Sequence, residues 1–247
     1  MTRLVDMIRR LAESGDIAII PIGFRCYTKN KIQNCLGFSQ PTLPFDNGFF
    51  SPDSVANVFL EPSFSLSVED PSSFALCEKN ENFYLKGYGF GVAFSTRDID
   101  FLDHSISSTV NSIERNRFLD STGAYYTFIP KHGFVLAHYN WHKSSAKYFG
   151  SLESSFDEIN SIYTRRIQRM FELCKKAKYV LFVYDESESS FLSVDSAVSD
   201  LSSFSRFHHI ISKVLVADFS CCSVEQLQSS RFLQSLLDHI QLKSSNV

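Results

Sequence analysis

The sequence predicts an α/β fold with three layers, in which a mostly parallel central sheet carries helices on both faces. Three short and almost wholly apolar runs, residues 16–23, 179–184 and 214–219, are typical of strands buried on both faces of a sheet. Each run is linked to segments with helical periodicity, the pattern that connects parallel strands. The aromatic-rich stretch at about residues 62–138 is predicted to be a β-rich insertion.

Helix, strand and loop signals alternate along the first quarter of the chain. Residues 1–15 repeat apolar side chains at helical spacing among charges, which predicts an amphipathic helix and not a signal peptide. After the strand at 16–23, residues 24–36 are predicted to form a short helix, and the Pro, Asp, Asn and Gly content of residues 39–50 predicts a loop. The Ser-Pro-Asp run at 51–53 then predicts a helix start, since serine can cap and proline is tolerated in the first turn.

The middle of the chain has fewer regular patterns. Residues 61–82 are serine-rich and predict a loop with one short strand, and residues 83–94 are aromatic, glycine-rich and predicted to be extended. Residues 103–120 are predicted to be helical. Residues 124–129 and 134–138 are predicted to be two strands joined by a Pro-Lys-His-Gly turn, which is hairpin chemistry.

The last part of the chain alternates long helical patterns with buried strands. Residues 156–178 hold apolar side chains at the 3–4 spacing of the strongest helix in the sequence. The strand at 179–184 follows, and then a predicted helix at 194–207, the strand at 214–219 and an amphipathic helix at 224–242.

Composition bounds the class of protein and its partners. The chain has 247 residues, of which 44% are hydrophobic and 24 are Phe, enough for a real core in one domain at 1–242, with residues 243–247 as a frayed tail. The formal net charge of -3 does not indicate a nucleic-acid partner, and no apolar run is long enough to span a membrane. We therefore expect neither a nucleic-acid nor a membrane partner. The six cysteines lack disulfide spacing, which predicts a reducing, cytoplasmic compartment.

The most promising reactive group is Cys26. Ligands of open α/β sheets bind at the carboxyl ends of strands, and Cys26 follows the first predicted strand in Gly23-Phe24-Arg25-Cys26. A helix N-terminus and the Arg25 guanidinium would both favour the thiolate, and Gly23, Phe24 and Arg25 would line the substrate site. The alternative is a buried cysteine that packs as a small hydrophobe.

A thiol nucleophile needs a base, and His138 ends the predicted strand at 134–138. Asn140 could orient its ring, in a Cys-His-Asn arrangement, while Trp141 and His142 would line the substrate pocket. The two histidines could instead bind a metal, but no carboxylate completes a known spacing, and no metal or cofactor is expected.

Two further charged residues are candidates for the same site. Asp46 stands in a stiff Pro-Phe-Asp loop, where it forms an Asx-turn or orients the catalytic histidine. Arg166, on the predicted long helix, could bind an anionic part of the substrate or simply face solvent. His132, in the hairpin turn, is predicted to lie at the surface.

Four pieces of sequence in this order resemble a mostly bacterial family of unknown function that carries the label papain-like cysteine peptidase. They are Gly-Phe-Arg-Cys at 23–26, Pro-Phe-Asp at 44–46, the apolar run that ends at His138, and Tyr-Thr-Arg-Arg-Ile at 163–167. The resemblance implies that Cys26 is the nucleophile, His138 the base and Asp46 a structural or orienting acid. Tyr139 stands where the family has an aspartate.

Three functions remain open from the sequence. The first is a cysteine hydrolase that acts on a peptide, isopeptide or ester. The second is an acyl- or glycosyl-transferase of surface-polysaccharide assembly, because the placement of Cys26 after a buried strand resembles the nucleophile of SGNH-type hydrolases and of a capsule-polysaccharide acetyltransferase family. The third is a binding module for a small molecule, peptide or glycan without catalysis.

Overall fold

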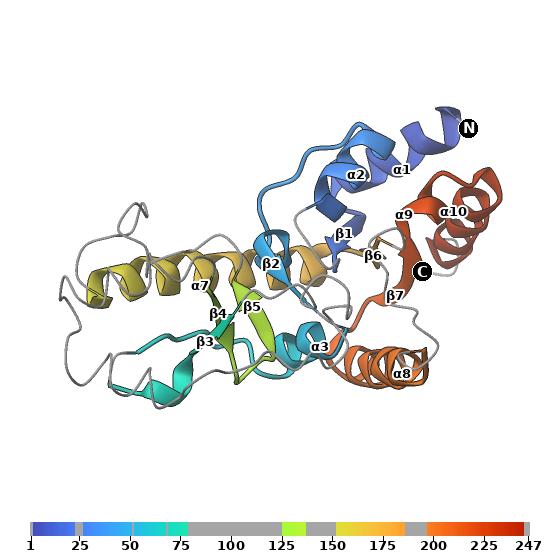
Figure 1. The fold of residues 1–247 in the computed structure, drawn as a ribbon. Coiled ribbons are helices and arrows are strands. Elements are labelled where there is room, and N and C mark those ends of the chain that lie inside the picture. The colour runs from blue at the N-terminus through green and yellow to red at the C-terminus, as the bar shows by residue number, and fades with distance from the viewer. Residues whose placement is uncertain are drawn as a thin grey trace.

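The computed structural model describes most of the regular elements of the chain. The described residues are 2–22, 27–50, 52–67, 69–78, 125–136, 152–185 and 197–244. The α/β class predicted from the sequence is confirmed by a parallel sheet that helices cover (Figure 1). The predictions for residues 83–94 and 103–120 lie outside the described residues.

The parallel sheet has three strands in the order β1-β6-β7. Strand β1 (Ile17–Pro21) pairs with β6 (Tyr179–Tyr184), and β6 pairs on its other side with β7 (Asp218–Ser223). All residues of β1 and five of the six in β6 are buried. These strands are apolar along their whole length because both of their faces lie against protein.

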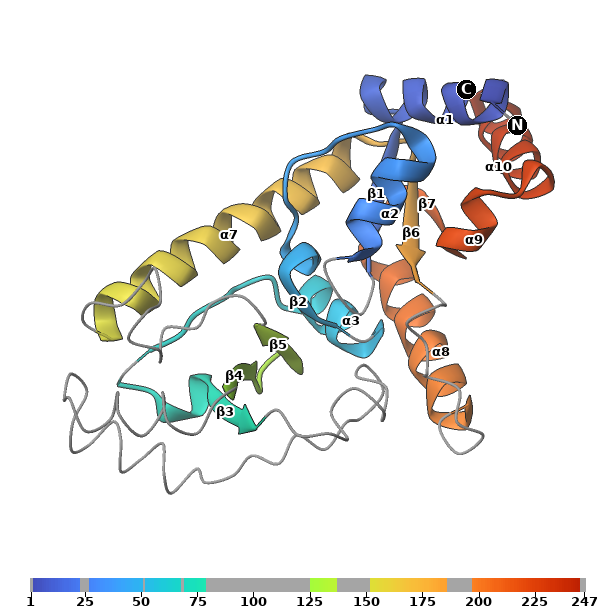
Figure 2. The same ribbon diagram turned by 45° about the horizontal axis from the view of Figure 1, so that its top comes forward.

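One face of the sheet packs on helices from the two ends of the chain. These helices are α1 (Thr2–Ser14), α2 (Tyr27–Leu36), α9 (Val224–Leu227) and α10 (Ser230–Ser244). The odd-numbered strand residues Ile17, Ile19 and Leu181 lie in this core, together with Ile8 of α1 and Leu233 of α10. Figure 2 shows α1 and α10 near each other, beside the strands.

The other face packs on helices from the middle of the chain. These are α3 (Pro52–Leu60), the long α7 (Leu152–Lys176) and α8 (Ala197–Val214). The strand residues Ala18, Ile20 and Phe182 belong to this core. The ring of Phe182 meets those of Phe59 on α3 and Phe207 on α8 edge-on, at centroid distances of 5.8 and 5.1 Å.

A separate antiparallel sheet follows the order β2-β5-β4-β3. Its strands are β2 (Gly48–Phe49), β3 (Ala75–Glu78), β4 (Tyr125–Ile129) and β5 (Phe134–Leu136). The predicted hairpin is present, and Gly133 closes its turn with a φ of 74°, which favours glycine. Strand β2 joins β5 from a point before the predicted insertion, directly after the 3-10 turn η1 (Pro44–Asn47). A second such turn, η2 (Pro71–Ser73), precedes β3.

The predicted position of the third buried strand is wrong. The apolar run 214–219 was expected to be the strand, but α8 continues to Val214 and β7 begins only at Asp218. The amide of Leu215 still donates to the carbonyl of Ile211 at 2.9 Å, so the helix consumes the start of the run. An apolar run of this length does not distinguish the end of a helix from a buried strand.

None of the helices in the described ranges is long and apolar enough to cross a bilayer.

His132 is buried, so its prediction as a surface residue is wrong. Its ring stacks on Phe64 and Phe134 at centroid distances of 6.5 and 5.8 Å, and only 1% of the residue is exposed. The Nε2 atom lies 2.8 Å from the carbonyl oxygen of Glu61 and therefore carries the proton, while the buried Nδ1 has no partner in the part of the chain that the structure describes. The side chain ties the hairpin turn to the segment after α3, and burial lowers its pKa.

Because the pKa of His132 is lowered in the fold, the unfolded chain takes up a proton first as the pH falls below about 6.5. We expect the wild type to lose stability between pH 6.5 and pH 5. A His132→Phe variant loses the bond to Glu61 and should be about 1 kcal/mol less stable at pH 8. The difference in the free energy of unfolding between wild type and variant should become smaller toward pH 5, as measured by urea unfolding at each pH. A gap that stays constant would contradict the assignment.

Candidate functional site

The carboxyl ends of β1 and β6 meet at one edge of the sheet because the two strands run parallel. The amide of Ile22, after β1, donates to the carbonyl of Val183 at 2.8 Å and continues the ladder to this edge. Helix α2 begins at Tyr27, so its N-terminus follows the end of β1 after a short link. In open α/β sheets this edge is where ligands bind.

Asp46 lies in the turn η1 beside the start of α2. Its Oδ2 accepts a hydrogen bond from the amide of Leu43 at 2.7 Å, and the Nζ of Lys29 on α2 is 3.1 Å away. The side chain of Asp46 is 2% exposed and that of Lys29 is 15% exposed. The hydrogen bond reaches back to the amide three residues earlier and not forward to the backbone two residues on, so Asp46 closes the turn η1 in a different way from the predicted Asx-turn. It also forms a buried ion pair with α2.

Burial raises the pKa of Asp46, and the amide of Leu43 and the charges of Lys29 and Arg166 oppose this rise. Arg166 reaches this region from α7, where its guanidinium lies 5.6 Å from the ring centroid of Tyr163. The half-buried Arg166 is thus near Asp46 and is not a fully solvated side chain. Sequence reasoning named both residues as site candidates, and the fold brings them together.

A second arginine of α7 fixes the loop that carries Asp46. The Nη1 of Arg169 donates to the carbonyl oxygen of Thr42 at 2.7 Å. The Nζ of Lys29 lies 3.4 Å from the hydroxyl of the same threonine. Helix α7, the loop before η1 and the first turn of α2 are therefore joined by polar contacts at one place.

A second buried carboxylate lies at the same edge, and sequence reasoning missed it as a site residue. Asp185 follows β6 directly, its side chain is completely buried, and Lys31 of α2 places its Nζ 2.5 Å from Oδ2. The signal that could have found it is its position, since it is the first charged residue after a buried strand that ends at the ligand edge.

Thr28 completes the first turn of α2. It is 1% exposed, and its hydroxyl has no hydrogen-bond partner among the described residues. A buried hydroxyl without a partner costs stability, and such groups are common where a ligand or a reacting group completes the set of hydrogen bonds.

Most of the predicted site residues lie outside the described residues. These are Gly23, Phe24, Arg25, Cys26, His138, Asn140, Trp141 and His142.

Three described cysteines are unsuited to act as nucleophiles. Burial raises the pKa of Cys174 and of Cys221 to about 12, and it raises that of Cys222 as well. Because the thiolate is the reactive form, these side chains are protonated at neutral pH and serve as packing groups. In the described part of the chain, no group of three or more His, Cys, Asp or Glu side chains has the geometry of a metal site.

Comparisons with protein-family models, curated proteins and solved structures find no match to this chain.

Removal of Lys29 tests the buried pair directly. Lys29→Met leaves the Asp46 carboxylate buried without its lysine, and we expect the free energy of unfolding to fall by about 3 kcal/mol at pH 7. The folded pKa of Asp46, already raised, should rise further. The protein then binds a proton more readily when folded, so the loss should shrink as the pH falls toward 4.

Urea unfolding of three variants provides the controls. Asp46→Asn combined with Lys29→Met should recover part of the loss, because no unpaired charge remains. Lys131→Met breaks the exposed pair between Lys131 and Glu61 and should cost much less than Lys29→Met. Equal costs for Lys29→Met and Lys131→Met would contradict a buried pair.

Proposed function

We propose that the protein is a cysteine-dependent hydrolase of a peptide, isopeptide or ester bond, with Cys26 as nucleophile, His138 as base and Asp46 as the orienting acid. The framework of this proposal is a three-layered domain whose β-rich insertion, at about residues 62–138, delivers the base. The observation that carries it is the meeting of α2, η1 and α7 around the ion pair between Lys29 and Asp46.

The position of the nucleophile is supported by the covalent chain. Cys26 directly precedes Tyr27, the first residue of α2, so its Cα lies about 3.8 Å from that of Tyr27. It is three residues from Lys29, which contacts Asp46. A thiol at the N-terminal end of a helix is stabilised as the thiolate by the helix dipole, and Arg25 adds a positive charge.

The position of the base is supported by the register of the antiparallel sheet. Leu136 of β5 stands opposite Gly48 of β2. Gly48 is two residues after Asp46, and His138 is two residues after Leu136. Two residues of chain span at most about 7 Å, so His138 starts from the same end of the sheet that holds Asp46.

The proposed reaction follows from these groups. The Cys26 thiolate adds to the carbonyl carbon, and amide groups of the backbone at residues 24–27 stabilise the oxyanion. The C–N or C–O bond then breaks, and the leaving group takes a proton from the His138 imidazolium. Water attacks the resulting thioester, gives its proton to His138 and releases a carboxylic acid, which restores the thiolate.

The remaining candidates take supporting roles in this proposal. Asn140 would orient the ring of His138 together with Asp46. Gly23, Phe24, Trp141 and His142 would line the substrate pocket. Arg166, which already acts on Asp46, would meet an anionic group of the substrate.

Alkylation of the thiols by iodoacetamide tests the nucleophile. We expect Cys26 to react rapidly at pH 6, since a helix N-terminus lowers a thiol pKa from about 8.5 to roughly 3.5–7.5. Cys26→Ala should abolish this labelling and the hydrolysis of activated esters, with thermal unfolding unchanged. Cys35→Ala, which removes a half-buried thiol near the end of α2, is the matched control and should keep both.

Slow alkylation of Cys26, with a rate that increases only above pH 8, would contradict the catalytic proposal. Binding of coenzyme A or a nucleotide sugar in a thermal-shift screen, without hydrolysis of any ester or peptide, would replace it with a transferase.

The base has its own test. His138→Gln removes the proton acceptor, and we expect the rate of ester hydrolysis to fall about 10²- to 10⁴-fold. The pH–rate profile of this variant, measured by stopped-flow or steady-state kinetics between pH 5 and pH 9, should also lack the acidic limb that the imidazole causes. His142→Gln is the matched control, and its rate should fall far less. An equal loss in the two variants would contradict the assignment of His138 as the base, and a larger loss in His142→Gln would assign the base to His142.

A further inference from the structure

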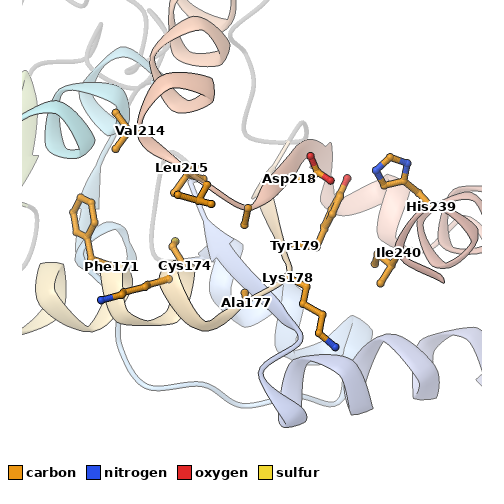
Figure 3. A pocket seen from close by; sticks show the side chains of 13 residues that line it. Phe171, Cys174, Ala177, Lys178, Tyr179, Val214, Leu215, Asp218, His239 and Ile240 are labelled. Carbon is orange, nitrogen blue, oxygen red and sulfur yellow. The ribbon is translucent and has the colours of Figure 1, made fainter. Parts of the chain in front are cut away.

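A groove of about 990 Å³ opens at the amino edge of the parallel sheet, at the opposite end of the strands from Asp185. Tyr179 and Asp218, the first residues of β6 and β7, both line it. Its volume falls in the range of small-molecule sites. Most of the wall is apolar. Figure 3 shows the side chains from α7 and the residue after it, from the end of α8 and the link that follows, and from α10: Phe171, Cys174, Ala177, Val214, Leu215 and Ile240.

The link between α8 and β7 leaves apolar side chains at the mouth of this groove. Val216 is fully exposed and Leu215 is only partly buried. This is the run Val-Leu-Val-Ala whose sequence is typical of a buried strand. Exposed apolar side chains gathered beside a pocket mark a ligand or interaction surface more often than isolated ones do.

The charges of the groove select a ligand of one sign. Lys175 lines the groove from the last turn of α7, and within the described residues it has no acidic partner. Lys178 also lines it and pairs with Asp16 at 2.9 Å. The carboxylate of Asp218 and the ring of His239 lie at the end away from Phe171 and Cys174 (Figure 3). A negative group is therefore attracted to the α7 end and repelled from the other.

We propose that this groove binds a free fatty carboxylate, with the carboxylate at Lys175 and the alkyl chain over Cys174, Leu215 and Ile240. The alkyl chain covers the apolar wall, and the Cys174 thiol, whose proton is held by burial, adds no charge to it. The site is independent of the proposed hydrolase chemistry, because it lies at the other edge of the sheet.

Calorimetric titration of the full chain with decanoate, below its micellar concentration, tests the proposal. We expect saturable binding at one site. Lys175→Glu reverses the charge at the head of the ligand and should weaken binding about fivefold or more. Lys176→Glu is the matched control, because it makes the same charge change at the next, exposed residue of α7, which does not line the groove. It should change the affinity less than about twofold.

A second variant keeps the test independent of Lys175. Val216→Asp places a negative charge on a fully exposed side chain at the mouth and should also weaken decanoate binding about fivefold or more, with the far-UV spectrum unchanged. Equal effects of Lys175→Glu and Lys176→Glu, the absence of saturation, or binding to phosphatidylglycerol vesicles without binding of decanoate would each overturn the proposal.

Discussion

Strand β6 is the constraint on which the rest of the structure depends. It pairs with β1 on one side and β7 on the other, and its residues alternate between two cores. Leu181 faces the core formed with α1, α2, α9 and α10, whereas Phe182 faces the core formed with α3, α7 and α8. Each fully buried side chain of this kind contributes about 1.5–3 kcal/mol, so a polar residue within β6 would weaken the core that this residue faces, and the strand as a whole holds the two cores together.

The candidate site lies where the buried strand β6 ends. β6 is apolar up to Tyr184, and Asp185 is the first charge after it. A carboxylate that is still inside the protein needs a cation, and Lys31 supplies one. Lys29 does the same for Asp46, so one helix supplies the partners of two buried acids that come from distant parts of the sequence. The two pairs hold the N-terminal half of α2 between the sheet and η1.

Local patterns were sufficient where burial is uniform. The runs that became β1 and β6 were found because a strand covered on both faces has no polar positions, and α7 was found because one of its stripes is consistently apolar. The position of β7 could not be found in this way. Its residues Ser220, Cys221 and Ser223 are not strongly apolar, while the apolar run before it ends a helix and faces the groove. Burial of His132 depends on Phe64 and on Glu61, about 70 residues earlier, and no local pattern contains that information.

Some residues of the candidate site could likewise be found from local sequence patterns, and others could not. The candidates Asp46 and Arg166 were chosen from short motifs, and the fold brings them near each other because η1 and α7 meet at α2. Asp185 and Lys31 carry no motif, and only the pairing of β1 with β6 places α2 over the end of β6. The two edges of the sheet also differ in character for a physical reason. At the carboxyl edge, buried acids and lysines neutralise one another beside the N-terminus of α2. At the amino edge, helices α7 and α8 end and leave apolar side chains beside Lys175, which has no acidic partner among the residues that the structure describes, and this suits the retention of an amphiphile.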